Sequence, residues 1–260
     1  MTKNTIKKRL KKILPNRLFV LKRNYTNYKV KQAGRKQKEY EFDAIFSVGN
    51  ACRPAYYLKK HELRLYANPL DWMMDYSLET AANLYKSKFN NFFINFSSDE
   101  QKSNWFIDIE NNVTSIHYQE IENENRAFNE KMKKRFGKVN QKLTKANKIC
   151  FISQRNENQA NFIDFLTKMG NLYSGQITFI NIKHNEEIDG IILPVKCNRK
   201  KISERLELIE YEFNDIHPNG NDKKFNADFW IGNINLWDQI IEKIHIKTSF
   251  ISYLLKSDSV

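Results

Sequence analysis

The sequence is poor in the residues that form turns and disulfides: its 260 residues include only 8 glycines, 5 prolines and 3 cysteines. So little glycine and proline argues against a loop-rich all-β sandwich. Cys52, Cys150 and Cys197 cannot all pair with one another, and their wide spacing matches no zinc site. The simplest interpretation is a protein of a reducing compartment, the cytoplasm, that uses no metal and no cofactor.

Long apolar segments and glycine-rich motifs are also missing. The sequence has no run of about 18 apolar residues, and its first forty residues lack the apolar region of a secretory signal. We therefore expect neither a membrane-spanning helix nor export. No glycine-rich phosphate loop is present, which weakens the expectation of a nucleotide site.

The net charge of +13 is concentrated at one end of the chain. Residues 1–40 contain 14 lysines and arginines and one acidic residue, whereas residues 41–260 contain 29 residues of each sign. The basic character therefore describes an arm and not the rest of the protein. We divide the chain into a basic arm and linker at 1–40 and a single body at 41–260, with a candidate sub-boundary near residue 146.

The arm has the pattern of a basic amphipathic helix that Pro15 ends or kinks. Lysine and arginine surround one apolar face, which is formed by Ile6, Leu10, Ile13 and Leu14. Such a helix can bind an anionic membrane, where each basic residue contributes about 1 kcal/mol. We favour this partner, and hence a peripheral position at the inner membrane face. Packing on the body or a solvated tail is the second alternative, and nucleic acid is the least favoured partner.

Strands and helices alternate along the body, which predicts an α/β fold with a mostly parallel central sheet flanked by helices. The clearest unit is a strand at 148–153, a helix at 158–173 and a strand at 176–182. This β-α-β order predicts parallel pairing with a right-handed crossover. Further strands are predicted at 42–49, 91–96, 104–119, 189–197 and 205–213, and further helices at 53–63, 78–89, 120–147 and 235–244.

Cys52 is the strongest candidate for a reactive group. It lies where the strand at 42–49 turns into the helix at 53–63, beyond the carboxyl end of a central strand, where open α/β sheets build their sites. A thiol at a helix N-terminus faces unpaired N–H groups and the positive end of the helix dipole, and both favour the thiolate. We predict a nucleophile there. The alternative is a buried cysteine that only packs, which we favour for Cys150 and Cys197.

The residues around Cys52 suit the same chemistry. The backbone amides near Gly49 and Asn50 are predicted to form an oxyanion pocket, and Arg53 adds positive charge beside the thiol. A cysteine nucleophile requires a base. Of the five histidines, His117 fits best, because it too is predicted at the end of a strand.

The acids that could orient the histidine are Asp71, Asp108, Glu120 and Glu122. We choose Asp71, which precedes Trp72 in the sequence NPLDWM. An aspartate next to a large aromatic residue is an unusual choice for a solvated loop. A turn or helix-capping role explains Asp71 equally well. The residues predicted to contact substrate are Arg53, Trp72, Arg135, Arg155 and Trp230.

Four motifs carry a resemblance: FSVGNACRPAYYLKKHELR, NPLDWM, the histidine of SIHYQE and a basic helix ending in KKRF. Together they resemble a family of bacterial papain-like cysteine peptidases of uncharacterised function, often encoded near genes for surface polysaccharides. The similarity is strongest at 42–137, with a weaker echo, FWIGNINLW, at 229–237. It implies that Cys52 is the nucleophile and His117 the base. The basic run KMKKRF has one arginine fewer than the family pattern.

Two enzymatic functions remain open. The first is a cysteine hydrolase or acyl transferase, in which Cys52 attacks the carbonyl of a peptide, an amide-bearing sugar or an O-acyl group. The second is a glycosyltransferase or related transferase of surface-polysaccharide synthesis, in which Asp71 is the base or a ligand of a substrate hydroxyl. Arg135 and Arg155 would face the phosphates of a nucleotide sugar. An adaptor without activity is a third alternative. We favour the cysteine hydrolase, because the position of Cys52 and the resemblance agree.

Overall fold

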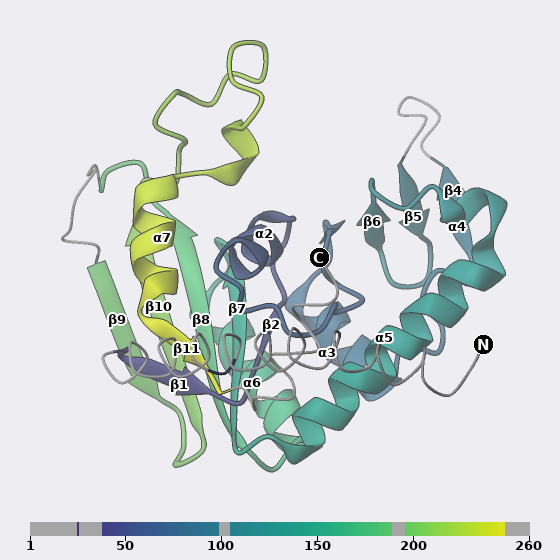
Figure 1. Cartoon of the computed structure of the whole chain (residues 1–260), viewed down its shortest axis with the longest axis horizontal. Coiled ribbons are helices and arrows are strands. Elements are labelled where there is room, and N and C mark those ends of the chain that lie inside the picture. Colours follow the sequence, from purple (N-terminus) through teal and green to yellow (C-terminus); the bar gives the residue numbers. More distant parts are fainter. Residues whose placement is uncertain (1–24, 26–37, 99–104, 189–195, 248–260) are drawn as a thin grey trace, which may run out of the picture.

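The computed structural model describes Tyr25 and residues 38–98, 105–188 and 196–247 (Figure 1). Almost all of the predicted arm therefore lies outside the described residues, as does most of the strand predicted at 189–197. Within the described part, no helix has the length and apolar character that crossing a bilayer would require.

A five-stranded sheet, ordered β2-β7-β8-β10-β9, forms the centre of the fold (Figure 1). Its first four strands are parallel, and β9 joins the edge in the antiparallel direction. The predicted α/β fold with a mostly parallel sheet is thus confirmed. The strands are β2 (Ala44–Ser47), β7 (Lys148–Gln154), β8 (Gln176–His184), β10 (Leu206–Phe213) and β9 (Lys196–Lys201).

The predicted β-α-β unit is also confirmed. Helix α6 (Gln159–Leu172) connects β7 to β8, and the two strands pair in parallel. The helix begins where the side chain of Asn158 accepts a hydrogen bond from the backbone N–H of Asn161 at 3.1 Å. This side-chain cap satisfies one of the donors that a helix start leaves unpaired.

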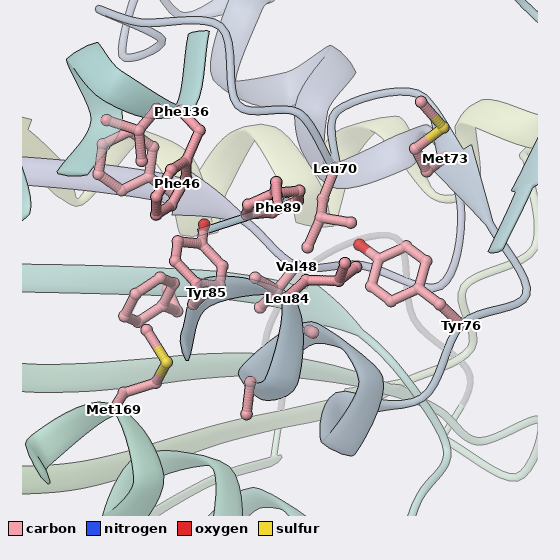
Figure 2. Close-up of a cluster of buried hydrophobic side chains, with 14 of the residues drawn as sticks. Phe46, Val48, Leu70, Met73, Tyr76, Leu84, Tyr85, Phe89, Phe136 and Met169 are labelled. Atoms are coloured by element: carbon pink, nitrogen blue, oxygen red, sulfur yellow. The ribbon is translucent and has the colours of Figure 1, made fainter. Parts of the chain in front are cut away.

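Helices cover both faces of the central sheet, because its strands are apolar on both sides. Alternate residues of β7 enter opposite cores: Phe151 packs into one core and Cys150 into the other. Figure 2 shows part of the first core, around Tyr85 and Phe89. The first core also receives α3 (Leu78–Lys86), α5 (Asn125–Lys145) and α6. The second receives α2 (Arg53–Lys60) and α7 (Ile234–Glu242). The fold therefore has three layers, with the parallel sheet in the middle.

A smaller antiparallel sheet, ordered β3-β6-β5-β4, lies beside this layered body (Figure 1). Its importance is that β6 leads directly to His117. Its strands are β3 (Met73–Met74), β4 (Phe96–Ser98), β5 (Phe106–Asp108) and β6 (Val113–Ser115). The remaining elements are β1 (Tyr40–Phe42), paired with β11 (Ile244–Ile246), the 3-10 helix η1 (Phe229–Ile231) and α4 (Glu120–Asn123).

Four sequence-based elements need correction. The strand predicted at 104–119 is divided into β5 and β6, because residues 109–112 form a turn between them. The strand predicted at 91–96 is wrong, because the chain turns there and buries both Phe92 and Phe93 instead of alternating them. Phe93 has a φ of 52° and donates its backbone N–H to Asp108 Oδ2 at 2.7 Å. The strand predicted at 42–49 is divided into β1 and β2. The single helix predicted at 120–147 is divided into α4 and α5 at Glu124, whose φ of −138° is not helical.

Candidate active site

Cys52 occupies the N-cap position of α2, just after β2 ends, as the sequence predicts. The turn before it requires glycine for lack of space: a Cβ on Gly49 would lie 2.5 Å from Cγ of Pro54. Pro54 is tolerated there because the first turn of a helix needs no backbone N–H donor. The close contact between Gly49 and Pro54 thus sets where the thiol emerges from the fold.

The structure brings Cys52 and His117 together. The thiol Sγ lies 3.2 Å from Nε2 of His117, although 65 residues separate them along the chain. Cys52 is buried, with 7% of its surface exposed, whereas His117 is open to solvent. A substrate can therefore approach the pair from the side of the imidazole.

The protonation states differ from the sequence-based expectation. Burial raises the pKa of the Cys52 thiol to about 11, and the opposing effect of its own backbone N–H is smaller. Partial burial lowers the pKa of His117. Burial of the thiol therefore opposes the resting thiolate that the helix start leads us to expect. At neutral pH a neutral thiol faces a neutral imidazole, whose Nε2 can accept the thiol proton.

Backbone amides next to the thiol are available for an oxyanion. The N–H groups of Asn50, Ala51 and Cys52 donate to no oxygen in the described part of the chain. The turn is held instead through the carbonyl oxygen of Asn50, which accepts the backbone N–H of Asp75 at 3.3 Å. Amides fixed in this way are suited to stabilise negative charge that develops on a substrate oxygen.

Asp71 is fully engaged in a buried network and does not reach the histidine. Its carboxylate accepts hydrogen bonds from Ser47 Oγ, from Nε of Arg64 at 2.6 Å and from the backbone N–H of Asn68 at 2.9 Å. Among the described residues, neither Asp71 nor any other acid hydrogen-bonds to His117. The contacts of Asp71 fit a residue that fixes its loop. They provide no direct support for an orienting acid.

Trp72, which follows Asp71, contacts the base. Its ring meets the His117 ring edge-on, with 5.6 Å between centroids and an interplanar angle of 75°. The φ of Trp72 is 67°, a left-handed conformation that bulky residues rarely adopt. The buried Asp71 carboxylate thus anchors a strained loop that presents the indole to the imidazole.

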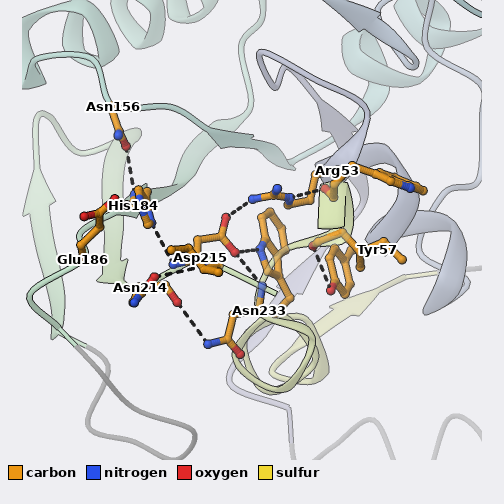
Figure 3. Close-up of polar contacts among 12 residues, drawn as sticks. Arg53, Tyr57, Asn156, His184, Glu186, Asn214, Asp215 and Asn233 are labelled. Atoms are coloured by element: carbon orange, nitrogen blue, oxygen red, sulfur yellow. Dashed lines mark hydrogen bonds and ion pairs between the residues drawn. The ribbon is translucent and has the colours of Figure 1, made fainter. Parts of the chain in front are cut away.

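Arg53 is half-buried and extends toward Asp215, in a distant part of the chain (Figure 3). It pairs with Asp215, whose side chain is 1% exposed, and donates from Nε to the carbonyl of Trp230 at 2.7 Å. Asp215 also accepts the backbone N–H of Asn233 at 3.0 Å and the indole N–H of Trp237 at 2.9 Å. This buried pair fixes the start of α2, so the predicted contact between Arg53 and substrate does not fit its position.

The sequence alone does not predict the pairing of Arg53 with Asp215. Gly232 makes it possible, because a Cβ there would lie 2.7 Å from the guanidinium carbon of Arg53. The φ of Gly232 is also +77°, which favours glycine. Trp230 is half-buried, and its ring packs edge-on against Tyr56 at 5.2 Å. The sequence does place Asp215 just after a central strand, at the edge of the sheet where α/β proteins build their functional sites. That position is the feature that could have identified Asp215.

The other two predicted arginines differ from each other. Arg155 is buried and donates from Nε to the carbonyl of Val48 at 3.1 Å. Its guanidinium carbon lies 5.0 Å from the ring centre of Tyr76. It supports the chain leaving β2 and is not positioned to contact a substrate. Arg135 is half-buried on α5 and donates to the hydroxyl of Tyr118 at 2.8 Å. In the described part, no three His, Cys, Asp or Glu side chains are grouped so that they could hold a metal ion.

Comparison with known proteins adds one finding to this geometry. A family model described as "Putative papain-like cysteine peptidase (DUF1796)" matches residues 43–185. The matched segment includes Cys52, Asp71, Trp72 and His117, and it ends before Asp215. No curated protein and no solved structure matches the chain.

Proposed function

The chain belongs to the family described as "putative papain-like cysteine peptidase", and on that basis we propose that it hydrolyses peptide or related amide bonds with Cys52 as nucleophile and His117 as base. The observation that carries the proposal is the 3.2 Å separation of Sγ and Nε2 at the start of a helix. A nucleophile within hydrogen-bonding reach of its base is the arrangement that covalent catalysis requires.

The neutral pair defines the order of the steps. As Sγ of Cys52 bonds to the substrate carbonyl carbon, its proton moves to Nε2 of His117, and the carbonyl oxygen gains negative charge beside the amides of 50–52. When the C–N bond breaks, the imidazolium gives its proton to the departing amine and a thioester remains. Water then attacks the thioester while His117 takes a proton from it. The C–S bond breaks, the acid is released, and the imidazolium returns a proton to sulfur.

The base works without a carboxylate partner in the described part of the chain. Its orientation comes from the edge contact with Trp72, and such aromatic pairs contribute about 0.5–1.5 kcal/mol beyond the area they bury. Catalysis in this site therefore depends on the positions of the two reacting groups and on the free amides.

Acyl transfer is a variant of the same chemistry, in which an alcohol or amine takes the acyl group in place of water. The nucleotide-sugar transferase finds less support. Asp71 already accepts three hydrogen bonds, and Arg155 is buried, so neither is placed to act as a base or as a phosphate ligand. We therefore carry forward the cysteine hydrolase.

Contact of residues 1–40 with an anionic membrane remains part of the proposal, and so does a role in surface-polysaccharide metabolism. The charge pattern of the arm supports the first, and the family resemblance supports the second. Co-sedimentation with phosphatidylglycerol vesicles, compared with phosphatidylcholine vesicles, tests the membrane contact. Equal binding to both would contradict it.

Digestion of a mixed peptide library, read by mass spectrometry, tests the proposed activity. The wild-type protein should cleave a subset of peptides, and Cys52→Ser and His117→Ala should each lose at least about a thousandfold in rate. Cys197→Ser is the matched control, because Cys197 is exposed and should retain full activity. Cleavage by Cys52→Ser at the wild-type rate, or no cleavage by any form, would refute the peptidase.

A further inference from the structure

Helix α5 carries a row of basic side chains along one face. Six cations recur at helical spacing, at i, i+3, i+4, i+7, i+11 and i+14, and we call them the basic row: Lys131, Lys134, Arg135, Lys138, Lys142 and Lys145. A helix rises about 1.5 Å per residue, so the row is about 21 Å long. It is distinct from the face of α5 that packs into the core, which includes Phe128, Met132 and Phe136.

One end of the row contacts Tyr118, the residue that follows the catalytic base in the chain. Arg135 donates from Nη1 to the hydroxyl of Tyr118 at 2.8 Å, and Nζ of Lys131 lies 5.1 Å from the centre of the same ring. Tyr118 directly follows His117 in the chain, and consecutive Cα atoms are about 3.8 Å apart. A ligand on the row could therefore extend into the active site.

Most of the charge of the row is not neutralised. Lys131 pairs with Glu120 at 2.9 Å, and Arg135 also lies near enough to help lower the pKa of that carboxyl group. The other four lysines form no ion pair within the described residues. The first four cations line a concavity of about 470 Å³ that contains one acidic residue, Glu130. A second concavity, of about 410 Å³, lies at the far end beside Lys145.

We propose that the basic row is a substrate-binding surface for peptides with several acidic side chains on one side of the scissile bond. The proposal rests on the proposed function, because amide hydrolysis selects a peptide over other polyanions. An extended peptide advances about 3.3 Å per residue, so the row spans about six of its residues. The arm at 1–40 is not complementary to this surface, because it carries the same sign of charge.

Binding can be measured apart from turnover in the inactive Cys52→Ser protein. The probe is a fluorescent peptide with six glutamates next to a neutral segment, and the same peptide with glutamines is its reference. Lys134→Gln/Lys138→Gln removes two charges from the row, whereas Arg126→Gln/Lys133→Gln removes two exposed charges of α5 outside it. We expect the row variant to bind about tenfold more weakly and the control less than about twofold, with the difference reduced by added salt.

Three results would overturn the proposal: equal losses in both variants, equal binding of the glutamate and glutamine peptides, or tighter row-dependent binding of an oligothymidylate of the same charge. Cleavage assays with the active protein distinguish a failure of the substrate-binding surface from a failure of the proposed function. Cleavage of acidic and neutral peptides at equal rates would reject the row and keep the peptidase. Row-dependent binding of the acidic peptide without any cleavage would reject the peptidase and keep the surface.

Discussion

The two sides of the active site are held in different ways. The nucleophile side is fixed by buried polar contacts, because Arg53, next to Cys52, pairs with Asp215 at a separation of 162 residues. On the base side, one hydrogen bond to the thiol and one ring contact with Trp72 hold the imidazole within the described chain. The difference suggests that substitutions on the nucleophile side reduce the stability of the fold, whereas those on the base side reduce activity with little loss of stability.

Asp215→Ala should have the largest effect on stability. It leaves the half-buried Arg53 without its carboxylate and removes the acceptor for two further buried donors, which costs about 3–5 kcal/mol in the free energy of unfolding. Asp238→Ala is the matched control, because Asp238 of α7 pairs with Lys60 and His61 at the half-exposed C-terminal end of α2 and should cost about 1 kcal/mol or less. Urea titration measures both, and equal losses would contradict the comparison.

Gly49→Ala should have the next largest effect. The added methyl group collides with Pro54, so we expect a loss of about 1–3 kcal/mol in unfolding free energy together with a fall in kcat as Cys52 moves. Gly137→Ala, in the middle of α5 with open space around it, should instead stabilise the protein by about 0.5–1 kcal/mol. Thermal denaturation and measurements of kcat for the two variants test both predictions. A Gly49→Ala protein with wild-type stability and kcat would refute the role of that contact.

Trp72→Ala tests the base side. Loss of the edge contact with His117 should lower kcat about tenfold, which corresponds to the upper part of the energy expected for such a pair. The free energy of unfolding should change less than it does in Asp215→Ala, and Trp72→Phe should recover most of the activity. If Trp72→Ala loses stability as severely as Asp215→Ala while its kcat is unchanged, the contrast between the two sides is wrong.

The smallest expected effect concerns the pH dependence of kcat/KM, which shows whether Cys52 and His117 are both neutral in the resting enzyme. Because partial burial lowers the pKa of His117, the base form persists to lower pH, and kcat/KM should fall only as pH drops through a value below about 6.5. The thiol, with its pKa raised to about 11, should add no inflection between about pH 7 and 10. A bell-shaped profile with a descending limb near pH 8 would instead indicate a resting thiolate–imidazolium pair.

Local patterns explain which parts of the structure the sequence predicts well. The β-α-β unit, the cap at Asn158 and the position of Cys52 before α2 depend on residues that are close together in sequence. His117 was identified because it follows a short strand, and that signal is local too. The strand predicted at 91–96 fails because Phe92 and Phe93 both enter one core, with Phe93 in a left-handed conformation, which periodicity does not reveal.

The remaining features depend on contacts between distant segments. The pairing of Arg53 with Asp215 joins segments that no spacing rule connects. The raised pKa of Cys52 follows from burial by the whole fold, an effect opposite in direction to that expected from the helix start alone. The engagement of Asp71 with Ser47, Arg64 and Asn68 is likewise a property of the packed interior.

The most direct test of the Cys52–His117 pair is the site at which a peptidyl vinyl sulfone reacts, located by mass spectrometry after proteolysis. At neutral pH the wild-type protein should gain one adduct, on Cys52, and His117→Ala should gain it at least about a hundredfold more slowly. Cys197→Ser should react like the wild type. Labelling of Cys52 at the same rate without the imidazole, or labelling of Cys197 alone, would contradict the account.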